Sequence, residues 1–61
     1  TAIGTRTLLY VIESKIEDAL AEVSDRLKEE TDPLIRANLE GRMLGYQRSL
    51  DCIREVRETL A

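Results

Sequence analysis

The break at Thr31-Asp32-Pro33 is the feature that most constrains what this sequence can fold into. Asp32 is a residue type that caps helix N-termini, and Pro33 suits the first helical position, where a missing N–H costs nothing. A connection of only a few residues predicts that the flanking helices are antiparallel neighbours. We therefore expect an all-α, antiparallel two-helix hairpin. Its expected parts, within one domain of residues 1–61, are a first helix at about 5–30, a turn at about 30–33 and a second helix at about 33–60.

Each predicted helix carries one apolar stripe, found by turning successive residues through about 100°. The first stripe consists of Leu9, Ile12, Ile16, Ala19, Leu20, Val23 and Leu27. The second consists of Ile35, Leu39, Met43, Tyr46, Leu50, Ile53 and Leu60. We expect the two stripes to face each other and form the core. The opposite side of the first helix is an acidic row, made of Asp18, Glu22, Asp25 and Glu29.

The size of the chain indicates that the hairpin associates with further helices. A chain of 61 residues is near the limit at which one core sustains a fold, and small domains usually rely on disulfides, a metal or oligomerisation. The sequence has one cysteine and no histidine, which favours oligomerisation. Apolar residues reach 43% of the chain, a proportion that argues against disorder. We expect a four-helix bundle formed by a homodimer, or a larger helical oligomer.

A second arc of small or apolar side chains on the second helix predicts where association occurs. After Leu34, the arc continues with Ala37, Gly41, Gly45, Ser49, Cys52 and Val56, which we predict to be the oligomer interface. A glycine inside a helix costs about 1 kcal/mol relative to alanine, so close approach of another backbone is the expected compensation. The alternative is that a glycine accommodates a bulky neighbour within the same hairpin. The run Leu8–Ile12 is apolar all round and also predicts cover by another chain.

The residue types give little support for catalysis. Histidine, the commonest general base near neutral pH, is absent. Cys52 lies in the small-residue arc, which favours a packed thiol over a nucleophile. Glu13 and Glu17 lie one turn apart and have the chemistry to bind a hard cation, but a solvated acidic face is the favoured interpretation. We expect no enzymatic activity, no cofactor and no metal.

The arginines of the second helix raise the question of nucleic-acid or ligand binding. Arg36, Arg42 and Arg48 point to three different sides of a helix, and the net charge is −3, so one chain lacks a basic stripe. Pairing with acids of the first helix is the favoured interpretation. If assembly aligns arginines, Arg36 and Arg54 are the candidate nucleic-acid contacts. Arg42 and Arg57 lie at or inside the apolar stripe, where their stems can cover the core. Arg42 and Tyr46, one turn apart, are the candidate lining of an anion pocket.

The sequence also bears on location. No apolar run approaches the roughly 20 residues that span a bilayer, and no secretory signal is present, so we expect an intracellular, cytoplasmic protein without membrane contact. The single cysteine is compatible with a reducing compartment. The first residue is Thr1 rather than methionine, as in a processed product or a piece of a longer chain.

Three functional hypotheses follow from these patterns. The leading one is a non-catalytic, self-associating interaction or assembly module, whose acidic face binds a basic or helical protein partner. The second is a nucleic-acid-binding regulator or phage-type DNA-packaging component that acts as an oligomer. In architecture the predicted hairpin is comparable to plasmid copy-control hairpins and to the oligomerisation hairpins of phage small terminase subunits, although no motif residue carries over. The third is a binder of small anionic ligands with a pocket between helices.

Overall fold

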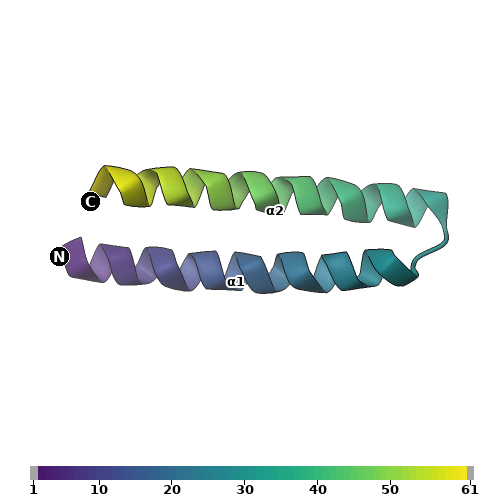
Figure 1. The fold of residues 1–61 in the computed structure, drawn as a ribbon, viewed down its shortest axis with the longest axis horizontal. Coiled ribbons are helices and arrows are strands. Elements are labelled where there is room, and N and C mark those ends of the chain that lie inside the picture. The colour runs from purple at the N-terminus through teal and green to yellow at the C-terminus, as the bar shows by residue number, and fades with distance from the viewer. Residues whose placement is uncertain (1, 61) are drawn as a thin grey trace.

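Two antiparallel helices make up the described part of the protein. In the computed structural model, which describes residues 2–60 and side chains from residue 4 onward, α1 spans Ala2–Glu29 and α2 spans Pro33–Leu60. The helices lie side by side in a rod of 47 × 15 × 11 Å, and the start of α1 lies beside the end of α2 (Figure 1). We refer to this end as the open end. Residues 2–60 contain no strand, so the predicted all-α antiparallel hairpin is confirmed.

The start of α2 follows the predicted capping chemistry. Asp32 Oδ1 accepts hydrogen bonds from the backbone N–H of Leu34 at 2.9 Å and of Ile35 at 3.5 Å. These bonds satisfy two of the N–H groups that have no partner inside a helix. Pro33 is the first residue of α2, as predicted.

The end of α1 is closed by two side chains around the turn. The Arg36 guanidinium donates from Nη1 to the backbone oxygens of Leu27 at 2.9 Å and Glu30 at 2.8 Å. The Glu30 carboxylate accepts from the backbone N–H groups of Thr31 and Asp32. A positive group on terminal carbonyls also suits the negative end of the helix dipole. Arg36 is therefore a structural residue of the turn in the single chain.

The contact between the helices follows an alternating four- and three-residue spacing, as in a coiled coil. In α1 the buried or half-buried residues with this spacing are Leu9, Glu13, Ile16, Leu20, Val23 and Leu27. In α2 they are Arg36, Leu39, Met43, Tyr46, Leu50, Ile53 and Arg57. Only Val23, Leu39 and Leu50 are buried apolar residues among those described, so the core of one hairpin is thin.

Three residues predicted for the apolar stripes are exposed in the hairpin. Ile12, Ile35 and Leu60 are 45%, 42% and 38% exposed. Charged neighbours, Glu13 and Arg36 among them, take the contact positions. The reason is that one partner helix covers only a narrow strip of each helix, whereas the stripes were defined over an arc of roughly 100°. The placement of these three residues in the hairpin core was therefore wrong.

Membrane crossing needs a helix that is both long and apolar. Among residues 2–60, no helix meets both conditions.

Candidate association surface and its glutamate–arginine cluster

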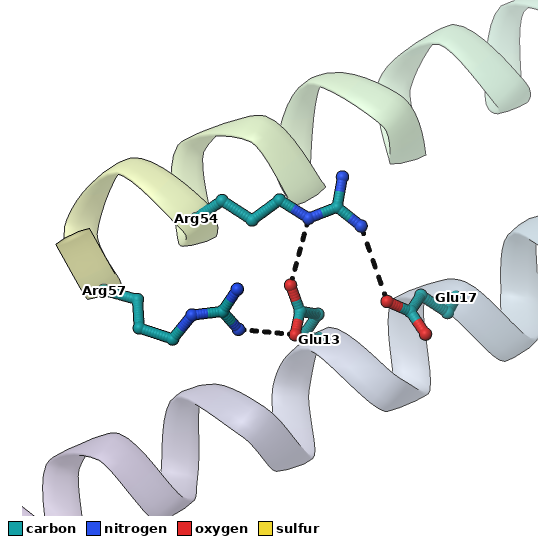
Figure 2. Close-up of polar contacts among 4 residues, drawn as sticks. All are labelled: Glu13, Glu17, Arg54 and Arg57. Carbon is teal, nitrogen blue, oxygen red and sulfur yellow. Dashed lines mark hydrogen bonds and ion pairs between the residues drawn. The ribbon is translucent and has the colours of Figure 1, made fainter.

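A cluster of two glutamates and two arginines joins α1 to α2 near the open end (Figure 2). Arg57 Nη1 donates to Glu13 Oε1 at 2.6 Å, and Arg54 Nε donates to Glu13 Oε2 at 3.1 Å. Arg54 Nη2 also lies 3.5 Å from Glu17 Oε1. Both oxygens of Glu13 are thus held by guanidinium groups, and Arg54 bridges two carboxylates one turn apart. Such charge-assisted contacts are stronger than those between neutral groups.

Glu13 is the central member of this cluster. It is only 9% exposed. The hydrogen bond from Arg57 holds the pKa of the Glu13 carboxyl below its usual value, against the opposing effect of desolvation, and Arg54 adds to the lowering. The Arg57 guanidinium also lies over the Tyr10 ring, 4.8 Å from its centre, which is the geometry of a cation–π contact. Glu13 is therefore an ionised carboxylate at a helix–helix contact position.

The cluster both confirms and corrects the sequence interpretation. The expected pairing of second-helix arginines with first-helix acids is confirmed at Arg54 and Arg57. The placement of Glu13 on a solvated acidic face was wrong, because its carboxylate is enclosed between two arginines. The signal was present in the sequence: extending the alternating spacing of Ile16–Leu27 backwards reaches Glu13. The carboxylates considered for cation binding are occupied by Arg54 and Arg57, and no group suited to a metal ion occurs among the described residues.

Acidification is expected to weaken the hairpin through Glu13. The pKa of Glu13 is lower in the folded protein than in the unfolded chain, where it is about 4.5. The stabilisation is therefore present above that pH and is lost as the pH falls through the lower, folded-state pKa. We expect Glu13→Gln to reduce the melting temperature by several degrees at pH 7 and to flatten its dependence on pH below 4.5. Thermal circular dichroism across this pH range measures both effects.

Glu17→Gln is the matched control for this experiment. Glu17 is about half exposed and makes only the longer contact with Arg54. Its replacement should leave most of the acid sensitivity in place. Identical pH profiles for wild type and Glu13→Gln would contradict the role assigned to Glu13.

The residues predicted for the oligomer interface all lie exposed on the outer side of α2. They are Ala37, Gly41, Gly45, Ser49, Cys52 and Val56. If a Cβ atom were added to Gly41 or Gly45, no atom of the other helix would lie within 4 Å of it. The hairpin therefore does not require either glycine, which rules out the alternative that one of them accommodates a bulky neighbour inside it.

Two further members of this surface have defined surroundings. Ser49 Oγ donates to the Gly45 carbonyl oxygen at 2.9 Å, within the helix. Cys52 is exposed. The expectation of a packed thiol is thus not met by the hairpin alone, and packing of Cys52 would require a second chain.

The residues considered for ligand binding are not gathered into one site. Arg42 is exposed and Tyr46 is half-buried, and no hydrogen bond or ion pair joins Arg42 to another described residue. A cavity of about 220 Å³ at the open end is lined instead by Arg6, Tyr10, Arg57 and Glu58. Its arginines are already engaged, because Arg6 donates to the Leu60 carbonyl and Arg57 is paired with Glu13. The geometry does not favour an anion at either position.

Comparison of the chain with protein-family models, with curated proteins and with solved structures found no match.

Proposed function

We propose that this protein is a non-catalytic interaction module that associates with copies of itself, most simply as a four-helix homodimer. The open space over Gly41 and Gly45 carries the proposal. Two glycines weaken a helix by about 1 kcal/mol each, and the hairpin uses neither of them. Large apolar side chains are exposed on the same helix, including Leu34 and Val56. A second helix backbone lying close to the glycines would offset their cost and cover apolar surface.

The accessible area of the single hairpin supports the same proposal. The chain exposes 4713 Å². A compact monomer of its mass would expose about 4,000 Å². The excess is close to the roughly 800 Å² that each partner loses in a standard protein–protein interface. Pairing two copies would therefore bring the area per chain near the value for a compact fold.

The contacts of the arginines favour an interaction module over a nucleic-acid regulator. Arg36 is engaged with the end of α1, and Arg54 with Glu13 and Glu17. These are the two residues considered for phosphate contact, and each would have to leave an existing partner. The acidic row of Asp18, Glu22, Asp25 and Glu29 remains exposed on α1, away from α2. In the proposed dimer this row stays outside, where it is able to bind a basic protein partner.

The direct test is the mass of the protein in solution. Light scattering coupled to size exclusion, run over a range of concentrations, should give at least twice the 6.9 kDa of one chain. The assembly should persist at high salt, because its contacts are mainly apolar. A folded monomer at every concentration would refute the proposal. A shift of nucleic-acid mobility that disappears with rising salt would favour the regulator instead.

A further inference from the structure

The two flanks of the hairpin differ in chemistry. Each helix has a line of residues facing its partner, and residues on either side of that line belong to one flank or the other. Arg54 and Glu17 lie outside this line and contact each other, so they lie on the same side, which we name the ion-pair flank. Figure 2 shows this side of the hairpin.

The helical period places the exposed apolar residues of the open end on the opposite side. In α1, Ile12 lies about 75° from the contact line in the direction away from Glu17, and Leu8 lies about 120° from it in the same direction. In α2, Val56 lies about 80° from the contact line in the direction away from Arg54, whereas Leu60, three residues after Arg57, continues the contact line at the end of the helix. Since Arg54 and Glu17 share one flank, Leu8, Ile12 and Val56 lie on the other side, which we name the apolar flank. These three residues and the neighbouring Leu60 are exposed in the single chain.

Other parts of the sequence gather on the same flank. Ile35, one of the residues displaced from the expected core, lies on the side of α2 away from Arg54, as do Ser49 and the adjoining Gly45. The displaced residues Ile12 and Ile35 thus lie on one flank of the hairpin, and Leu60 lies where this flank meets the contact line. Apolar side chains exposed on this flank are explained if another chain covers them. On the ion-pair flank near the open end, Glu17 and Arg54 are paired with each other, and Arg57 lies over the ring of the exposed Tyr10.

We infer that a second copy of the chain packs on the apolar flank, so that its interface is built from α1 as well as α2. The residues in the contact would be Ile12, Ile35, Ser49 and Val56, with Leu60 at its edge. A two-fold dimer brings the same patch of both copies together, so an apolar flank is complementary to itself. The excess area of the hairpin matches what such a dimer would bury. This inference rests on the proposed self-association and adds the position of the contact.

A competing surface exists on the ion-pair flank, nearer the turn. A shallow groove of about 300 Å³ is lined by Leu27, Glu40, Met43, Leu44 and Gln47. Leu44 is its most exposed apolar side chain. Glu40 and Gln47 border this groove. The apolar flank also carries Arg26 and Arg42, but its apolar residues come from both helices. Leu44 therefore provides the matched control.

The test compares three glutamate variants, Ile12→Glu, Val56→Glu and Leu44→Glu, by sedimentation equilibrium. Burying an unpaired carboxylate twice in a two-fold contact should raise the dimer dissociation constant at least about a hundredfold for Ile12→Glu and Val56→Glu. Leu44→Glu should change it less than about threefold, as surface substitutions usually do. The three residues are exposed in the hairpin, so circular dichroism should show each variant helical.

The outcomes separate this inference from the proposed function. If the wild-type protein is monomeric at every concentration, both the proposed self-association and the inferred contact are refuted. If the wild-type protein and Ile12→Glu dimerise equally well, only the inferred contact is refuted, because the dimer interface would then not include Ile12 of α1. Dispersal by Leu44→Glu, with Ile12→Glu and Val56→Glu still dimeric, would place the second copy in the groove.

Discussion

Gly45→Leu is expected to dissociate the assembly while making the isolated hairpin more stable. A leucine side chain at this exposed position meets open space in the single chain, and leucine is a better helix former than glycine by about 0.8 kcal/mol. In the dimer the same side chain would hold apart two backbones that should lie close together. We expect the dissociation constant to rise at least about tenfold, which corresponds to about 1.4 kcal/mol.

The two effects can be measured on the same samples. Light scattering reports the loss of the dimer, and urea unfolding at concentrations that dissociate the wild type reports the gain in stability of the hairpin. Glu22→Leu, on the exposed outer side of α1, is the control, because it adds the same side chain to the helix that does not carry the small-residue arc. If Gly45→Leu and Glu22→Leu leave the mass equally unchanged, the glycines do not mark an interface.

Leu39→Ala is expected to unfold most of the protein at low concentration. Leu39 is 1% exposed and belongs to a core with few buried apolar side chains. Truncating a buried leucine costs about 2–5 kcal/mol. A chain of this length has a total stability of only about 3–9 kcal/mol. Alanine is the best helix former, so helix propensity cannot explain a loss of stability.

Leu44→Ala is the control for Leu39→Ala, because both lie inside α2 and Leu44 is 62% exposed. It should cost less than about 1 kcal/mol. Far-UV circular dichroism with heating distinguishes the two variants. Equal melting temperatures would mean that the contact of α1 with α2 does not stabilise the chain as the structure indicates.

The turn was easier to predict from the sequence than the contact between the helices. The turn depends on Asp32 and Pro33, whose effects act within a few residues, so it was predicted closely. The start of α1 at Ala2 rather than near residue 5 shows that helix ends without a clear cap are harder to place. Glu13 was missed because an arc of apolar residues was used where the narrower alternating spacing applied. The association surface was chosen from the glycines, and the structure adds that the hairpin itself does not need them.

By itself, the sequence determined that the chain forms two amphipathic helices joined by a short capped turn, because helix period, capping and proline geometry act locally. Only the tertiary structure decided which residues of each broad apolar arc face the other helix. That choice depends on where the partner helix lies, and it places Glu13 between Arg54 and Arg57 while Ile12, Ile35 and Leu60 stay open. The tertiary structure also distinguishes the two flanks of the hairpin, because each flank is made of residues from both helices.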